Sequence, residues 1–151
     1  MRICVIAVGK LRDAALKDLF ATYSQRLPWS VSVVEIPERS SGPPALRVQR
    51  EGEDLRRRLP DGPLIALDGT GADLTSEAFA EALARYRDDG AGTLAFAIGG
   101  ADGHPPETLA AADLVLSFGK ATWPHRLVRV MLAEQLYRAS AILAGHPYHR
   151  G

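Results

Sequence analysis

Two hydrophobic patterns alternate along this chain. Continuous apolar or β-branched runs are typical of strands that a parallel sheet buries on both faces; they occupy residues 2–8, 31–36, 63–68, 93–98 and 113–118. Between them lie segments with helical spacing or helix-starting residues, at 11–27, 45–59, 75–88, 105–112 and 124–144. Regular alternation of this kind predicts an α/β fold, with a mostly parallel sheet and helices on both faces. We expect one domain spanning residues 1–151.

Small residues gather after three of the predicted strands, at 68–71, 99–103 and 118–119. Ligands of open α/β sheets bind beyond the carboxyl ends of the strands, so these segments are candidate ligand loops. The first strand ends instead at Gly9 and Lys10, without a glycine-rich phosphate loop. Both a dinucleotide-binding Rossmann domain and a flavodoxin-like nucleotide-binding protein would need a phosphate loop after the first strand, so the sequence disfavours both.

The last predicted helix is apolar on more than one face. Its apolar residues are Leu127, Val128, Val130, Met131, Leu132, Leu136, Ala139, Ile142 and Leu143. One face of such a helix can pack on the sheet, while the other needs a second cover. A deeply buried helix is one explanation. In so small a domain, we expect the second face to contact another subunit, which predicts a homodimer.

A cluster of chemically active side chains follows this helix. His146, Tyr148, His149 and Arg150 lie within five positions around Pro147. C-terminal segments are usually poorly ordered unless they are held by contacts. The cluster is therefore a candidate site, although a tail clamped on a dimer interface would have the same composition.

Formal net charge is zero, but the charges are unevenly distributed. Residues 1–58 hold 11 Lys and Arg against 7 Asp and Glu, residues 59–116 hold 2 against 10, and residues 117–151 hold 5 against 1. Binding of a polyanion would therefore be local, although solvated faces can also produce such a partition. The helix expected at 45–59 carries five arginines, which fit either a solvated face or phosphate contacts.

Hydrophobic residues make up 46% of the chain and charged residues 24%, which is ordinary for a globular protein. No apolar run is long enough to span a bilayer, and the chain enters its first strand at Arg2 without a signal-peptide cleavage pattern. The single cysteine, Cys4, excludes an internal disulfide and lies in that strand. The four histidines lack the spacing of a metal site. We expect a cytoplasmic protein with no metal and no membrane contact.

Several segments together resemble one family, the RlmH-type methyltransferases of the SPOUT superfamily, which modify large-subunit ribosomal RNA. The matching segments cover the whole chain and occur in order: 8–11, 67–68, 96–103, 124–125, 127–130, 134–139 and 146–150. The run GGADG at 99–103 is common to many proteins. The last helix and the tail are specific to this family.

The resemblance implies a C-terminal deep trefoil knot and S-adenosylmethionine as the methyl donor. The donor contacts carried over by position fall on Leu67, Gly99, Gly100, Phe118, Gly119, Lys120, Ala121, Thr122 and Trp123. It also implies a homodimer, in which the tail of one subunit completes the site of the other. The implied reaction is N3 methylation of a pseudouridine in 23S ribosomal RNA, with the assembled ribosome as substrate.

The resemblance suggests roles for the remaining candidates. In the nucleotide site we expect Tyr148 to stack, His149 to accept or relay the N3 proton, and Arg150 to hold phosphate or stack on a base. His125 either meets the nucleotide or caps the last helix. Arg129, Arg138 and His146 are candidate RNA-binding residues, while Glu134 is the helical partner available to Arg138.

Two alternatives share the fold. One is a SPOUT methyltransferase that acts on transfer RNA, which the family-specific tail disfavours. The other is a ribosome-binding module without catalysis, which the glycines at 99–100 and the loop at 118–123 disfavour.

Overall fold

All five strands run parallel in one sheet with the order β2-β1-β4-β3-β5. The computed structural model describes residues 1–150, except for the side chain of His149. The strands are β1 (Arg2–Val8), β2 (Ser30–Ile36), β3 (Leu64–Asp73), β4 (Thr93–Ile98) and β5 (Leu114–Ser117). The helices are α1 (Ala14–Ser24), α2 (Pro44–Arg56), α3 (Ser76–Asp88), α4 (Pro106–Ala111) and α5 (His125–Ala144), followed by the 3-10 turn η1 (Pro147–Arg150). The predicted α/β class is confirmed.

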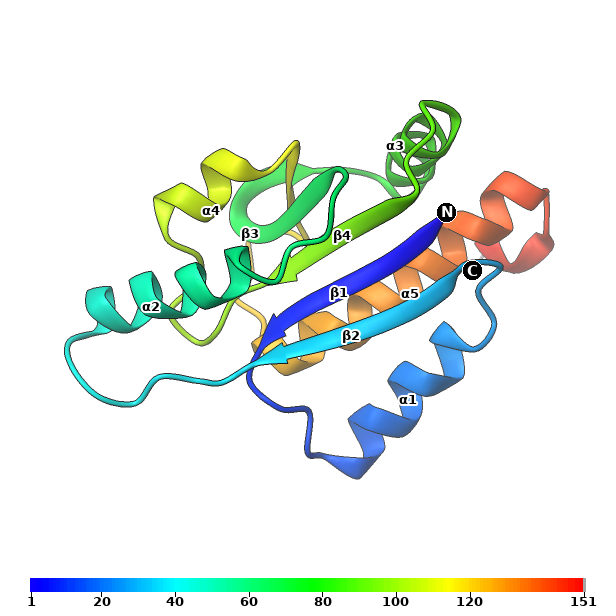
Figure 1. Ribbon diagram of the computed structural model, residues 1–151. Helices are drawn as coiled ribbons and strands as arrows, with labels where there is room; N and C mark the ends of the chain where they lie inside the picture. Colours follow the sequence, from blue (N-terminus) through cyan, green and yellow to red (C-terminus); the bar gives the residue numbers. More distant parts are fainter. Residues whose placement is uncertain (151) are drawn as a thin grey trace.

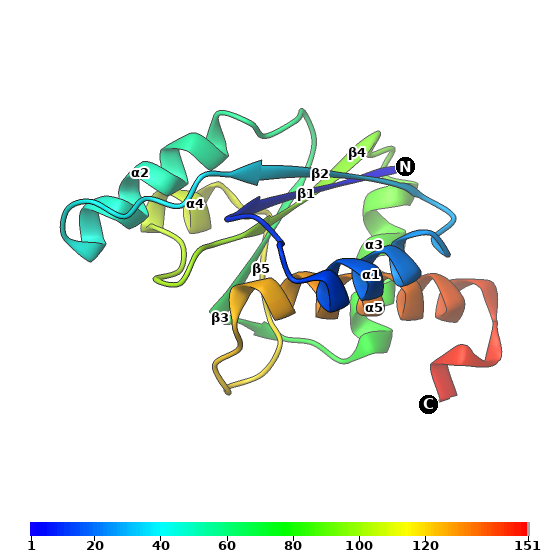
Figure 2. The same ribbon diagram turned by 90° about the horizontal axis from the view of Figure 1, so that it is seen from below.

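Helices cover both faces of the sheet (Figures 1 and 2). Alternate residues of β1 point to opposite faces, as the two-residue period of a strand requires. Ile3, Val5 and Ala7 pack with Phe79 and Leu83 of α3 and with Leu132 and Leu136 of α5. Cys4, Ile6 and Val8 belong to the other core, with Leu55 of α2 and Leu109 of α4. The helix α1 lies on the outer side of α5, where Tyr23 and Tyr137 are in ring contact.

The helix predicted at 11–27 is shorter than expected. It begins at Ala14, because the Asp13 carboxylate caps it by accepting from the Leu16 N–H at 3.1 Å. Leu11 lies before the helix and is buried, and its N–H donates to Glu35 at 2.8 Å. No residue of α1 is buried. One side of this helix is therefore left without a cover in the single chain.

The strand predicted at 63–68 is longer than expected, because β3 continues to Asp73. Leu67 and Ala72 both pair with Leu116 of β5, so that residues 68–71 bulge out of the ladder between them. Glycine signals a bulge as well as a turn. The bulge turns residues 68 and 69 toward the carboxyl edge of the sheet, beside the other two glycine-bearing loops.

The chain leaves β5 at one edge of the sheet and passes through a loop at 118–124 into α5, which returns beneath the sheet (Figure 2). The trefoil knot implied by the resemblance stays a prediction. Among the described residues, no helix combines the length and apolar character needed to cross a membrane.

Candidate active site

The three loops at the carboxyl edge of the sheet enclose one cavity of about 300 Å³. It receives residues from the ends of β3, β4 and β5 and from the first turn of α5. All nine residues expected to contact the methyl donor line it: Leu67, Gly99, Gly100, Phe118, Gly119, Lys120, Ala121, Thr122 and Trp123. The cavity has the volume of a small-molecule site. We call it the cofactor cavity.

Internal hydrogen bonds shape the loop at 118–123. The Trp123 indole N–H donates to the Phe118 carbonyl at 3.1 Å, which closes the loop on itself. The Ser117 hydroxyl donates to the Gly119 carbonyl at 2.9 Å. Gly119 has a φ of 99°, a conformation that side chains strongly disfavour. The loop is therefore held by its own contacts and presents backbone groups to the cavity.

The wall opposite this loop is formed by Gly99 and Gly100, both of which are buried. A Cβ at Gly99 would lie 2.8 Å from the carbonyl carbon of Gly103, so that only glycine fits against this backbone. Apolar side chains of Leu67, Ile98 and Leu116 complete the wall. Peptide groups beside apolar side chains suit a ligand that is partly apolar and hydrogen-bonds through ring and carboxylate atoms.

His125 stands at the mouth of the cofactor cavity, at the first position of α5. Burial lowers the pKa of its imidazole, and the Arg126 guanidinium acts in the same direction, against the opposing charge of Glu38. Nε2 lies 3.5 Å from the Glu38 carboxylate and 3.2 Å from the Arg126 guanidinium. The lowered pKa favours a neutral imidazole at pH 7, which can accept or donate a hydrogen bond.

Comparisons with known proteins match nearly the whole length of the chain. The profile of the family described as "Predicted SPOUT methyltransferase" matches residues 1–149. The chain belongs to the SPOUT methyltransferase family. Similar curated proteins, each named ribosomal RNA large subunit methyltransferase H, come from Roseobacter denitrificans (52% identical), Rhodospirillum centenum (48%) and Bradyrhizobium diazoefficiens (47%). In each comparison, 99% of this chain and 99% of the relative are covered.

The tail of this SPOUT methyltransferase folds back on α5, and none of its described residues lines the cofactor cavity. The Tyr148 hydroxyl donates to Glu134 at 3.3 Å, and its ring packs on Tyr137 and under the Arg138 guanidinium. The His146 imidazole accepts from the Tyr148 N–H at 3.2 Å. Arg150 is exposed, and the side chain of His149 lies outside the described structure. Within one chain, the two halves of the expected site are thus separate.

The protonation of Tyr148 limits its chemistry. Burial raises the pKa of this phenol to about 12, and hydrogen bonds with Tyr23 and Glu134 act in the same direction as the nearby negative charge. The hydroxyl is therefore neutral at physiological pH. It can donate a hydrogen bond or stack, but it cannot act as a phenolate base.

Arg129 does not have the position expected of an RNA-binding residue. Its side chain is 3% exposed, and the guanidinium donates to the Glu35 carboxylate at 2.7 Å and to the Gly9 carbonyl at 3.0 Å. A guanidinium enclosed in this way is not available to a phosphate. We therefore correct its expected role: Arg129 attaches α5 to the ends of β1 and β2.

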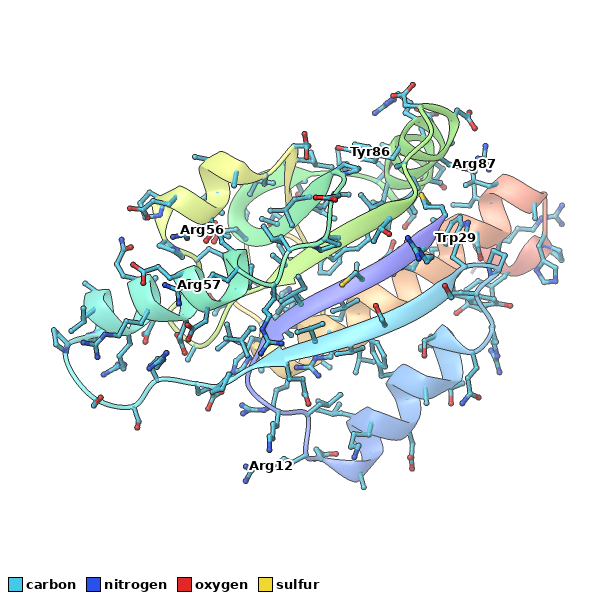
Figure 3. All side chains as sticks on the ribbon, in the orientation of Figure 1. Arg12, Trp29, Arg56, Arg57, Tyr86 and Arg87 are labelled. Carbon is cyan, nitrogen blue, oxygen red and sulfur yellow. The ribbon has the colours of Figure 1, made fainter. Side chains whose placement is uncertain are left out.

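Arg138 forms the predicted helical pair with Glu134, with nitrogen–oxygen distances of 2.9 and 2.6 Å. Arginines of α2 are also engaged within the protein. Arg47 bonds to Asp102, and Arg56 donates to Thr108 between α2 and α4. Arg57, the residue that follows α2, pairs with Asp54; Figure 3 labels Arg56 and Arg57. Phosphate contacts by Arg138, His146 or this helix stay predictions.

The donor contacts carried over from the resemblance did not include several residues that line the cofactor cavity, among them Asp68, Ser117 and Val128. Asp68 had a sequence signal, since the small residues at 68–71 were a candidate ligand loop. Val128 follows from the helical period, which places it about one turn after His125, a residue that also lines the cavity. Among the described residues, no group of three His, Cys, Asp or Glu side chains could hold a metal ion.

Proposed function

We propose that this SPOUT methyltransferase transfers a methyl group from S-adenosylmethionine to N3 of a pseudouridine in 23S ribosomal RNA, on the assembled ribosome and in the cytoplasm. One observation carries the proposal. All the loop residues that the resemblance assigns to the donor meet in a single cavity, in a chain whose full-length relatives are named as large-subunit ribosomal RNA methyltransferases.

The cofactor cavity fits the donor by its chemistry. Apolar side chains of Leu67, Ile98 and Phe118 suit the adenine ring, and the peptide groups of 99–100 and 118–123 suit hydrogen bonds to the adenine and amino-acid portions. When bound, the donor supplies an electrophilic methyl carbon on a sulfonium. The protein has to hold the target nitrogen in line with that carbon, and orientation of this kind lowers a barrier by about 7–11 kcal/mol.

A homodimer would bring the second half of the site to this cavity. A groove of about 500 Å³ runs between α1, α3 and α5 and is lined by Leu19, Tyr23, Leu127 and Met131, among others. Leu19 is 42% exposed in the single chain. We infer that a second copy covers this surface and that the tail of each subunit reaches the cofactor cavity of the other. Tyr148, His149 and Arg150 then hold the nucleotide from one subunit, while His125 faces it from the other.

Methyl transfer to ribosomes tests the function directly. Ribosomes from a strain lacking the modification are incubated with protein and labelled S-adenosylmethionine, beside free ribosomal RNA and transfer RNA. We expect label on ribosomes only, at N3 of a pseudouridine. Label on transfer RNA alone would assign the transfer RNA alternative. Donor binding without transfer to any of these RNAs would overturn the proposed reaction.

Mixed dimers test the composite site. A tail variant, Tyr148→Ala with Arg150→Ala, and a cavity variant, Gly99→Ala, should each have little activity alone when the donor concentration is kept well below the dissociation constant of the cavity variant. After subunit exchange, some dimers combine an intact cavity with an intact tail from the other subunit, and activity should return. Mixtures that remain inactive after verified exchange would show that the tail acts on its own cavity.

A further inference from the structure

A second cavity lies directly beside the cofactor cavity, on the α2 side. It has a volume of about 360 Å³, and its lining includes residues 38–40 after β2, Arg47 and Glu51 of α2, and Arg126 of α5. Two residues, Ala101 and His125, line both cavities. We call this second space the side cavity. Its position makes it a candidate place for the target nucleotide next to the methyl donor.

Glu51 is a buried carboxylate in the side cavity. Glu51 is 7% exposed, and every other carboxylate residue among the described residues is more exposed than this. One oxygen accepts the Arg39 backbone N–H at 3.1 Å. No ion pair to Glu51 is formed within the described part of the chain, although Asp54, one turn later on α2, pairs with Arg39 at 2.6 Å. A buried carboxylate without a counter-ion costs folding free energy, and such groups are commonest at functional sites.

The surroundings of Glu51 favour a proton acceptor. Burial raises the pKa of its carboxyl group, and the negative charges of Glu38 and Asp102 raise it further, against the Arg39 N–H and the Arg47 charge. A carboxylate with a raised pKa is a stronger base than an exposed one. His125, which also lines the side cavity, has a pKa that its burial lowers. Its imidazole therefore adds little positive charge beside Glu51 at pH 7.

Contact with Gly100 places this base at the boundary of the two cavities. A Cβ at Gly100 would lie 3.3 and 3.5 Å from the two carboxylate oxygens of Glu51. Since glycine has no side chain, the carboxylate lies against the backbone of a residue that lines the cofactor cavity. Arg39, Arg47 and Arg126 also line the side cavity. Each of them pairs with an acidic residue, namely Asp54, Asp102 and Glu38 respectively.

We propose that the side cavity receives the target base and that Glu51 is the general base of the methyl transfer, in place of His149. This assignment rests on the proposed function. The N3–H proton passes to a carboxylate oxygen of Glu51, and the N3 electron pair forms the new bond to the methyl carbon. The sulfur–methyl bond breaks with its electrons remaining on sulfur, giving S-adenosylhomocysteine. The open side cavity then releases the proton from Glu51 to water.

Glu51→Gln tests the assignment, with Glu53→Gln, an exposed carboxylate on the same helix, as the matched control. Single-turnover transfer to unmodified ribosomes is measured at saturating donor. We expect Glu51→Gln to be slowed at least about 100-fold, the lower end of general base catalysis, with donor affinity by calorimetry within about twofold of wild type. Its thermal stability should equal or exceed that of wild type, because glutamine buries no charge.

The dependence of rate on pH separates the two candidate bases. The wild-type rate should rise with pH as Glu51 loses its proton, and His149→Ala should keep that rise while Glu51→Gln loses it. A wild-type rate in Glu51→Gln, or a loss that merely follows weaker donor binding or unfolding, would overturn the role of Glu51 alone. If His149→Ala removed the rise instead, His149 would be the base. A wild-type protein that labels no RNA would overturn the proposed function and this assignment together.

Discussion

The Arg129 guanidinium donates to the Glu35 carboxylate at 2.7 Å and thereby joins α5 to the end of β2. The same carboxylate oxygen accepts the Leu11 N–H at 2.8 Å, which fixes the chain between β1 and α1. Two further contacts extend this connection, since Arg126 donates to the Lys10 carbonyl and to Glu38. The first turns of α5 are thus fixed to the strand ends, and with them His125 at the mouth of the cofactor cavity.

Removal of the Glu35 carboxylate should destabilise the protein. Glu35→Ala leaves the Arg129 charge buried, with the Gly9 carbonyl as its remaining partner among the described residues, and loss of one member of a buried pair costs about 3–5 kcal/mol. We expect the lower end, about 3 kcal/mol in the free energy of unfolding, because the Glu35 side chain is itself 35% exposed. Urea titration measures the loss. The exposed Glu53→Ala should change stability by less than about 0.5 kcal/mol, and equal losses in both variants would contradict this account.

The stability of the protein should fall as the pH drops below 6.5 because of His104. Burial lowers the pKa of this imidazole in the folded state below its usual 6.5. Below that pH the unfolded chain takes up a proton that the folded chain does not, so unfolding becomes easier until the folded pKa is reached. The free energies of unfolding of wild type and His104→Gln should therefore approach each other as the pH falls. A constant difference across this range would show that His104 is not the titrating group.

Gly99→Ala should weaken binding of the methyl donor. The new methyl group would lie within 3 Å of the backbone at Gly103, so that the loop at 99–103 has to move. We expect at least a tenfold rise in the dissociation constant, which corresponds to about 1.4 kcal/mol. Calorimetry with S-adenosylmethionine measures it. Gly92→Ala is the control, since a Cβ there meets nothing within 4 Å. Unchanged affinity in Gly99→Ala would separate this loop from the donor site.

Apolar patterns predicted the fold well where a strand is wholly buried. The bounds of β1 and β4 agree with the sequence prediction, because both strands are central and every position after the first faces a core. The extension of β3 was missed, since glycines at 69 and 71 give the same signal for a turn as for a bulge.

The site was harder to predict than the fold. The residues of the cofactor cavity could be named from the family-specific segments. Glu51 and Arg129 could not, because a charged side chain on a helix has the same sequence signal whether it is solvated or buried. Only the folded chain shows that both lie inside. Nor could the sequence show that the described tail residues do not line the cofactor cavity, since their position depends on the path of α5.

Leu19→Glu should weaken the proposed dimer without unfolding the subunit. Leu19 lies on α1 at the edge of the groove that also contains Leu127 and Met131, and a charge there would be buried against the second copy. Because the side chain is 42% exposed in the single chain, the substitution costs the isolated subunit little.

Leu46→Glu is a matched control, since Leu46 is 39% exposed but lies on α2, on the opposite face of the sheet. Sedimentation should show a dimer for wild type and Leu46→Glu, and a shift toward monomer for Leu19→Glu. In the proposed dimer, the cavity and the tail that complete one site come from different subunits, so methyl transfer by Leu19→Glu should fall in parallel and recover at high protein concentration. A monomeric wild type, or full activity in a monomeric Leu19→Glu, would contradict the composite site.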